Sequence, residues 1–349
     1  MFKAEELFQN VTDKNHPDET VLTIIQGKGT LPREQAGRNI HYDDASLSNY
    51  KKVEQGDFII HLRSFEGGLE MANEAGIVSP AYTILRCKRS HSSLFYDAYF
   101  HTDEFINHNL SKSVEGIRDG RQISYEAFKW LGIPYCEPTE QEKISNLFAA
   151  LNERIAKQRD LVESLKKYKR GLLSNAFRNA SSWRKKRLGE ICCIRTGKLD
   201  ANAMANDGKY PFFTCARERY SIDTYAFDTD ALLISGNGAN VGYIHHYTGK
   251  FNAYQRTYVL DQFQEDINYV HVFLNRFLSS RIDAEKKAGN TPYIVLSTLS
   301  DMEIYIPDET TTKQLVDLFT QIENRISYSA TVLEYLSSQR RGLLQQLFI

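Results

Sequence analysis

The sequence has 349 residues and a formal net charge of −1, and 42% of its residues are apolar. This length is enough for two or three domains, each with its own core. Because the chain is not basic overall, any nucleic-acid binding must come from local clusters of cations or from partner subunits. No apolar run approaches the roughly eighteen residues of a membrane span, and no charged-then-apolar leader begins the sequence. We therefore expect a cytoplasmic protein.

The cysteines predict free thiols and no zinc site. Their number is odd and no two are spaced as Cys-x-x-Cys; they are Cys87, Cys136, Cys192, Cys193 and Cys215. The nine histidines also lack ligand spacing. His245 and His246 are adjacent, so in a strand their side chains point to opposite faces. We expect no metal bound by this chain.

Residues 1–137 predict a mixed α/β domain. Apolar runs at 21–25 and 57–62 predict strands, each followed by glycine-bearing turns. Residues 77–85, interrupted by Pro80, predict a third strand, and the aromatic-rich stretch 94–110 predicts a helix. Residues 116–124 predict a polar loop, after which the chain leads into the next segment.

Residues 138–178 predict one long helix with the apolar seam of a coiled coil. At alternating steps of four and three the residues are apolar, except at Gln158 and Lys169. From Ile144 to Ala176, at about 1.5 Å per residue, the helix would be roughly 50 Å long, too long for one small core to cover. The apolar seam positions are Ile144, Phe148, Leu151, Ile155, Val162, Leu165, Leu172 and Ala176.

Residues 179–308 predict a second domain with the outline of the first. The basic run 183–187 predicts either a solvated linker or a phosphate contact. Residues 231–234 take the place of 58–61 and are again followed by a glycine-containing loop, at 236–242. Residues 252–260 take the place of 79–85. The two domains match less well than the helices, as expected if the domains do different jobs.

Residues 309–349 predict a second long helix that is a copy of the first. Each seam residue lies 171 positions after its counterpart, and both polar interruptions recur, at Ser329 and Arg340. Because a folded segment joins the helices, we expect an antiparallel pair, whose register Gln158 and Ser329 would fix. The apolar seam positions of this copy are Leu315, Phe319, Ile322, Ile326, Leu333, Leu336, Leu343 and Leu347.

The tetrapeptide Arg-Gly-Leu-Leu occurs in both helices, at 170–173 and 341–344. A glycine inside a helix costs roughly 1 kcal/mol relative to alanine, so Gly171 and Gly342 predict a close backbone approach or a bend. Taken together, the sequence predicts an α/β (α+β) chain. Two domains alternate with two long helices that pair as an antiparallel coiled coil, in a pseudo-twofold internal repeat.

This order of elements resembles the DNA specificity subunit of type I restriction-modification systems. The helix pattern T-E-Q-E-K-I-x-x-L-F, L-N-x-R-I and K-R-G-L-L stands at 139–148, 151–155 and 169–173. The second copy departs from it at 310–314, which read Thr-Thr-Thr-Lys-Gln. Residues 56–85 also look like a target recognition domain. The resemblance implies target recognition domains at 1–137 and 179–308 and conserved spacer helices at 138–178 and 309–349.

The resemblance also implies a function. In that family each target recognition domain reads one half of a split double-stranded DNA site, and the antiparallel helices fix the gap. The subunit is not catalytic and binds two methyltransferase subunits, which use S-adenosylmethionine to methylate adenine. It can further associate with restriction subunits that use ATP and Mg²⁺. No cofactor is then expected on this chain itself.

The motifs of the sequence give no support to catalysis. Neither Asn-Pro-Pro-Tyr nor Asp-Pro-Pro-Tyr is present, no phosphate loop of the type G-x-x-x-x-G-K-[ST] occurs, and the glycines at 236–242 do not fit G-x-G-x-x-G. Glu285 and Lys287 fit half of a nuclease motif, which is a common chance match. A self-contained nuclease and a coiled-coil scaffold that does not read DNA therefore remain the alternatives.

Candidate DNA-contacting residues are arginine, asparagine and glutamine in polar or glycine-bearing loops, because these side chains most often bind guanine and adenine directly. Each could instead be a solvated or salt-bridged surface residue. The candidates in the first domain are Arg33, Arg63, Arg118 and Arg121. Those in the second domain are Arg217, Arg219, Asn237, Asn240, Gln255, Arg256 and Asn290.

Overall fold

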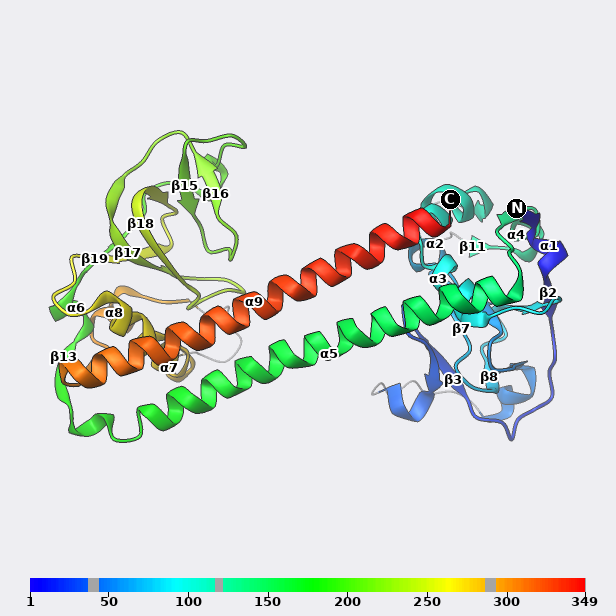
Figure 1. Cartoon of the computed structure of the whole chain (residues 1–349), viewed down its shortest axis with the longest axis horizontal. Coiled ribbons are helices and arrows are strands. Elements are labelled where there is room, and N and C mark those ends of the chain that lie inside the picture. The colour runs from blue at the N-terminus through cyan, green and yellow to red at the C-terminus, as the bar shows by residue number, and fades with distance from the viewer. Residues whose placement is uncertain (37–43, 117–121, 286–292, 349) are drawn as a thin grey trace. The chain divides into compact units, whose positions relative to one another are not determined.

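The computed structural model describes residues 1–36, 44–116, 122–285 and 293–348. The chain divides into two compact units (Figure 1): unit 1 comprises Met1–Arg159 with Thr331–Ile349, and unit 2 comprises Asp160–Ala330. These units differ from the predicted domains, whose boundaries were placed at the helix ends. The division falls inside both long helices because each half-helix packs on the domain of its own unit.

Unit 1 is built on a four-stranded antiparallel sheet in the order β2-β9-β6-β7. Two-stranded sheets form from β1 with β12, β3 with β4, β5 with β8 and β10 with β11. The strands are β1 (Phe2–Lys3), β2 (Phe8–Val11), β3 (Leu22–Ile25), β4 (Gly29–Pro32), β5 (Lys51–Val53), β6 (Phe58–Ile60), β7 (Glu70–Met71), β8 (Gly76–Val78), β9 (Thr83–Cys87), β10 (Val114–Glu115), β11 (Gln122–Ile123) and β12 (Gly132–Ile133). The short helices are α1 (Ala4–Leu7), α2 (Ser64–Gly67), α3 (Ser93–Phe100) and α4 (Tyr125–Phe128).

The central strand β6 of unit 1 is buried on both faces. Phe58 and Ile60 pack in a cluster with the aromatic side chains of α3, whereas Ile59 packs in a second cluster with Ile84 and Leu22. Successive residues of a strand point to opposite faces. A strand covered on both faces is apolar at every position, which is why 58–60 reads as a continuous apolar run.

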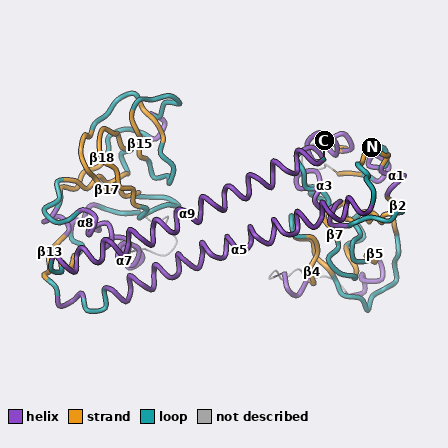
Figure 2. Tube along the Cα trace, in the orientation of Figure 1, coloured by secondary structure: helices purple, strands orange, loops and turns teal. Residues whose placement is uncertain are grey.

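Unit 2 is built on a six-stranded sheet in the order β14-β19-β17-β18-β15-β16, and β13 pairs with β20 separately. Within this six-stranded sheet β15 and β18 run parallel, and the other neighbouring strands run antiparallel (Figure 2 shows the strands in orange). The strands are β13 (Arg184–Arg187), β14 (Cys193–Thr196), β15 (Tyr210–Phe213), β16 (Tyr220–Ile222), β17 (Phe227–Ser235), β18 (Ile244–Ala253), β19 (Thr257–Asp261) and β20 (Glu303–Ile306). The helices within this domain are α6 (Leu188–Ile191), α7 (Ile267–Glu285) and α8 (Leu296–Ser300).

The central strand β17 of unit 2 repeats the alternation of β6. Leu232 and Ile234 pack in the cluster that includes the buried face of α7, and Leu233 packs in a second cluster with Phe213 and Phe251. The two sheets also share the order of their first four strands, because β14-β19-β17-β18 corresponds to β2-β9-β6-β7. The same scaffold therefore supports both domains.

The long helices are α5 (Pro138–Ala176) and α9 (Glu309–Leu347). In unit 1 the start of α5 meets the end of α9, where the Phe148 and Phe348 ring centroids lie 6.3 Å apart. In unit 2 the end of α5 meets the start of α9, and Leu173 shares a core cluster with Leu315 and Phe319. The two helices are therefore antiparallel within each unit. The predicted apolar seam residues are buried or half-buried, except Leu347, which is 42% exposed.

The polar seam positions form matched contacts between the helices. In unit 2, Lys169 forms an ion pair with Glu323. In unit 1, Arg340 Nε donates a hydrogen bond of 2.6 Å to Asn152 Oδ1. Arg340 lies 171 residues after Lys169, and Glu323 lies 171 residues after Asn152. The internal repeat thus extends from the residue types to the contacts that they make.

The prediction of a close backbone approach at the helix glycines was wrong. A Cβ atom added at Gly171 or at Gly342 would meet no atom within 4 Å, apart from neighbours in its own helix. Both glycines lie inside helices that continue past them. Packing within either unit therefore does not require glycine at these positions.

Two local predictions also need correction. Residues 77–85 form two strands in different sheets, β8 and β9, because the chain turns after Ser79, whose carbonyl accepts from Tyr82 N. The helix expected at 94–110 ends as α3 at Phe100. The hydroxyl of Thr102 interrupts it by accepting from Phe105 N at 3.0 Å, and a π-helix, Glu104–Asn109, follows.

The basic run 183–187 is mostly a strand and not a linker. It forms β13, which pairs with β20. Lys185 forms an ion pair of 2.7 Å with Glu303, and Arg184 and Lys186 pair with Glu265 at 2.8 and 3.0 Å. These two carboxylates pair with three of the four cations of the run. Among the described residues, no helix is both long and apolar enough to cross a membrane.

Candidate nucleic-acid interface

Three loops of unit 2 converge beside the six-stranded sheet: 214–219 after β15, 236–243 between β17 and β18, and 254–256 between β18 and β19. Gly236 N donates to the carbonyl of Arg256 at 2.9 Å, and Asn240 Nδ2 donates to the carbonyl of Cys215 at 3.2 Å. A Cβ atom at Gly236 would lie 2.3 Å from the Arg256 carbonyl oxygen, so only glycine allows this approach. The hydrogen bonds hold the three loops as one surface.

Arg217 is the cation that this surface holds most firmly. Its Nε donates to Asn240 Oδ1 at 3.3 Å, and its guanidinium carbon lies 5.2 Å from the centroid of the Tyr243 ring. A guanidinium group has five N–H donors, so most remain available to a ligand. Arg217 and its neighbour Arg219 are both exposed. The position of Tyr243 under Arg217 was not predicted from the sequence.

The turn between β18 and β19 presents Gln255 and Arg256, which are both exposed. Gln255 Nε2 donates to Asp200 Oδ1 at 2.9 Å. These two residues border a cavity of about 280 Å³ together with Gly236, Tyr258 and Ile294. Asn237 is half-buried and forms an isolated bridge with Tyr293. The structure thus gathers Arg217, Arg219, Asn237, Asn240, Gln255 and Arg256 on the three loops, whereas Asn290 lies outside the described residues.

In unit 1, Arg63 lies in the loop between β6 and β7, which corresponds in strand order to the loop between β17 and β18. Its side chain is 70% exposed, and its Nε lies 3.3 Å from a carboxylate oxygen of Glu66. Such an exposed pair is weak and can open to bind a phosphate or a base. Arg33 begins a 3-10 helix, Arg33–Ala36. Its guanidinium carbon lies 6.0 Å from the centroid of the Tyr50 ring. Arg118 and Arg121 lie outside the described residues.

Glu70 and His101 form a buried polar network next to the loop that carries Arg63. Glu70 is fully buried, and His101 Nε2 lies 3.3 Å from Glu70 Oε1. Burial favours the protonated form of Glu70, but bonds from His101, Gly27 and Gly29 lower its pKa overall. Burial likewise opposes the charged form of His101, but Glu70 and Asp97 raise its pKa overall. The lowered pKa of Glu70 and the raised pKa of His101 both favour a buried ion pair between these two side chains.

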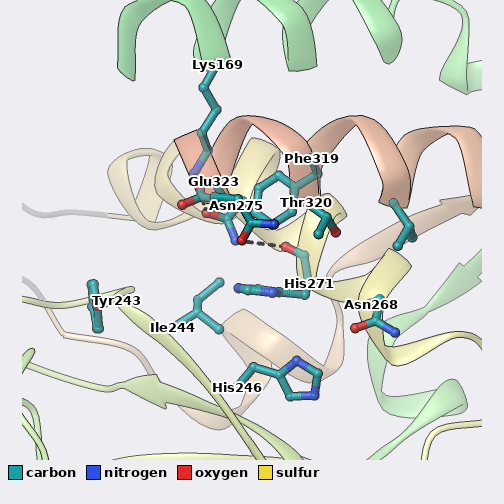
Figure 3. A pocket seen from close by; sticks show the side chains of 12 residues that line it. Lys169, Tyr243, Ile244, His246, Asn268, His271, Asn275, Phe319, Thr320 and Glu323 are labelled. Atoms are coloured by element: carbon teal, nitrogen blue, oxygen red, sulfur yellow. Dashed lines mark hydrogen bonds and ion pairs between the residues drawn. The ribbon is translucent and has the colours of Figure 1, made fainter. Parts of the chain in front are cut away.

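A cavity of about 390 Å³ lies in unit 2 where the end of α5, the start of α9, α7 and β18 meet (Figure 3). Lys169 reaches from α5 toward Glu323 and Asn275, and its Nζ lies 3.2 Å from Asn275 Oδ1. Burial, together with the charges of His246 and Lys169, lowers the pKa of His271 to about 4. His271 is therefore neutral near pH 7. The residues that line the cavity supply neither an activated nucleophile nor a cluster of metal ligands. We therefore interpret the cavity as a structural feature and not as an active site.

The residues of the alternative nuclease hypothesis have structural partners. Glu285 accepts a hydrogen bond of 2.6 Å from Thr298 Oγ1 and pairs with Arg281 at 2.8 Å, while Lys287 lies outside the described residues. In the part of the chain that the structure covers, no three His, Cys, Asp or Glu side chains gather to hold a metal ion. All five cysteines are free, and burial raises the pKa of Cys192 to about 12.

Comparison with known sequences identifies a family domain in the second half of the chain. Residues 180–336 match the family model described as the type I restriction modification DNA specificity domain. A relative, the type I restriction enzyme EcoDI specificity subunit of Escherichia coli, is 37% identical over 166 residues. That match covers 46% of this chain and 37% of the relative.

Comparison with solved structures extends the likeness in fold to the whole chain. The S subunit of a type I restriction-modification system from M. genitalium aligns over 100% of this chain and 95% of its own, with a TM-score of 0.63 and 15% identity. A chain from a study of assembly and conformational transition of the type I R-M system aligns over 99% and 96%, with a TM-score of 0.58 and 18% identity. The HsdS subunit from Thermoanaerobacter tengcongensis aligns over 99% and 95%, with a TM-score of 0.50 and 18% identity.

Proposed function

We propose that this chain, which belongs to the family of type I restriction-modification DNA specificity subunits, reads a bipartite double-stranded DNA target and directs partner adenine methyltransferases to it. Each unit reads one half of the target through the loops of its own sheet. The observation that carries the proposal is the match between the two sheets. Both have the same order of four strands, and both place candidate readers in the loop after the central strand.

The chemistry of the loops supports this assignment. The loop surface of unit 2 presents arginine, asparagine and glutamine, which pair with guanine or adenine edges in the major groove. Arg217 is held by Asn240 and Tyr243, so less side-chain entropy is lost when it binds. The loops of the two units differ in sequence and length. Unequal loops imply unequal half-sites.

In this proposal the helices set the gap between the half-sites and carry the partners. The seam residues of α5 are buried or half-buried. Leu147, Leu161 and Tyr168 of the same helix are exposed, at spacings that are multiples of seven. Exposed apolar side chains at helical spacing suit the docking of partner helices. We assign two methyltransferase subunits to this role, with restriction subunits as a further layer, in the cytoplasm.

The chain itself is proposed to be non-catalytic and to bind no cofactor. S-adenosylmethionine would belong to the methyltransferase subunits, and ATP and Mg²⁺ to the restriction subunits. This division agrees with the absence of methyltransferase and phosphate-loop motifs from the sequence. Because the partner subunits would carry out the chemistry, the loops of this chain would be free to vary with the DNA target.

The test is protection of DNA by the chain assembled with its co-encoded methyltransferase. We expect two protected half-sites on one sequence, with an affinity that falls steeply as salt increases, because phosphate contacts release counterions. Arg217→Ala should relax one base position of one half-site. Assembly with the methyltransferase but without sequence-selective protection would contradict the proposal and favour a scaffold. Metal-dependent cleavage by the isolated chain would favour a nuclease.

A further inference from the structure

The turn between β3 and β4 is exposed and positively charged, and none of its residues was predicted from the sequence to contact DNA. It consists of Gln26, Gly27 and Lys28, all exposed, and Lys28 N donates to the carbonyl of Ile25 at 2.9 Å. Gly27 and Gly29 have φ angles of +74° and +77°, which favour glycine. The turn is therefore tight, and its backbone conformation sets the directions of the Gln26 and Lys28 side chains.

Glu70 holds this turn from below. Its carboxylate accepts hydrogen bonds from Gly27 N at 2.7 Å and from Gly29 N at 2.8 Å. Burying a carboxylate is unfavourable unless it is hydrogen-bonded or paired, and here the two amides and His101 satisfy it. The fold therefore places a buried charge where its main effect is to fix the backbone of an exposed turn.

Asn73 holds the same turn from the other side. Its Nδ2 donates to the carbonyls of Lys28 and Thr30, both at 2.8 Å, and its backbone N donates to Thr30 Oγ1 at 3.0 Å. These bonds leave the side chain of Lys28 unconstrained while they fix its backbone. A tip that is rigid before binding loses less entropy when it engages a ligand.

The turn lies against the loop between β6 and β7. A Cβ atom at Gly67 would lie 2.1 Å from Gln26 Nε2, so the Gln26 amide rests on this glycine. The same loop presents Leu62, which is 63% exposed, and Arg63. In unit 2 the corresponding loop is contacted by the loop that carries Arg217. Each unit therefore places a second polar loop against the loop after its central strand.

We propose that Gln26 is a specificity-determining residue, and Lys28 a phosphate-contacting residue, for the half-site that unit 1 reads, with Glu70 and Asn73 as positioning residues. This inference rests on the proposed function. A glutamine side chain can donate from its amide nitrogen to N7 of adenine and accept from the N6 amine through its amide oxygen, and a two-stranded ribbon fits the major groove. A lysine beside it neutralises a phosphate without reading the sequence.

The experiment uses the full chain assembled with its co-encoded methyltransferase, and it maps methylated adenines by single-molecule sequencing. Gln26→Ala should relax one base position in one half of the motif, with roughly tenfold less discrimination there. Gln26→Glu should shift the preference at that position toward cytosine, because a carboxylate accepts from the cytosine N4 amine. An altered preference cannot arise from misfolding.

Lys28→Ala should leave the motif unchanged, weaken binding to all sites and reduce the slope of log affinity against log salt by about one. Glu70→Gln should relax the same base position as Gln26→Ala, whereas a merely structural role would lower methylation at every site equally. Gln9→Ala and Lys112→Ala are controls, because both residues are exposed in unit 1 outside the turn and should leave motif and slope unchanged.

The outcomes separate this inference from the function on which it rests. If the wild-type complex methylates a split motif and the Gln26 variants leave both halves unchanged, the assignment of Gln26 is overturned and the proposed function stands. If the wild-type complex shows no split motif, both fail. If Gln26→Ala alters the half that follows exchange of residues 179–308, the turn has been assigned to the wrong half-site.

Discussion

The two units have the same framework and differ in what they attach to it. In each unit the domain between the long helices or before them begins with a short strand and a four-residue helix. In each such helix a glutamate carboxylate accepts from the backbone N three residues earlier: Glu6 from Lys3 and Glu190 from Arg187. Each packs four strands in the same order. The attached loops share neither length nor chemistry. A common framework with different loops is what the proposed function requires of two domains that read different half-sites.

The helix ends are where a mutation should distinguish the units most strongly. Phe348 packs on Phe95, Tyr99 and Phe148 in unit 1, while its counterpart Phe177 packs on aromatic residues of α7 in unit 2. Truncation to alanine should destabilise the affected unit by about 3–5 kcal/mol. Hydrogen exchange should accelerate in unit 1 for Phe348→Ala and in unit 2 for Phe177→Ala. Equal acceleration in both units for either variant would show that they unfold together.

The helix glycines should give an effect of opposite sign. Because a Cβ atom at Gly171 or Gly342 meets open space, alanine at either position should stabilise the isolated chain by about 0.5–1 kcal/mol. Chemical denaturation measures this change. Gly189→Ala is the matched control, because its Cβ atom would lie 3.1 Å from Ser300 Cβ and should give no such gain. Destabilisation by Gly171→Ala would reveal a backbone constraint that the packing does not explain.

The polar seam contacts should differ in their response to salt. A double-mutant cycle on Lys169 and Glu323 should give a coupling of about 0.5 kcal/mol that falls as salt increases, because both groups are charged. The same cycle on Arg340 and Asn152 should give a coupling that salt changes little, because the amide is neutral. Identical salt dependence in the two cycles would remove this distinction between the units.

The smallest expected effect is the pH dependence that His101 gives to the stability of unit 1. The pKa of His101 is raised above its usual value of 6.5, so its contribution to stability is complete below about that pH and is lost as pH rises through the folded-state pKa. The difference in Tm between wild type and His101→Gln should therefore be larger at pH 6 than at pH 9. A difference that does not change with pH would mean that His101 stays neutral in the folded chain.

The sequence predicted the parts of the fold that local periodicity determines. The seam residues repeat every three or four positions, and this signal does not depend on the rest of the chain. The apolar runs of β6 and β17 were visible for the same reason. The unit boundaries were not predictable in this way. They depend on which domain core receives Leu173 and Leu344, which is a matter of tertiary packing.

The candidate interface was predicted by residue type and not by position in space. Glycine-bearing loops correctly suggested where backbones turn, and six candidates of unit 2 lie on loops that hydrogen bonds join. The strand in the basic run 183–187 was not predicted, because charge alone does not show that Glu265 and Glu303 form ion pairs with it. Gln26 was missed because its importance depends on Glu70, which is 44 residues away in the sequence.

The most direct test of the account is exchange of one recognition domain followed by methylation mapping. Residues 1–137 would be replaced by the corresponding segment of another specificity subunit, and methylated adenines would be mapped in cells that also carry the co-encoded methyltransferase. We predict a split motif with an unspecified gap, in which only one half changes and the gap is kept. A change in both halves, or methylation that does not depend on this chain, would contradict the assignment of one half-site to each unit.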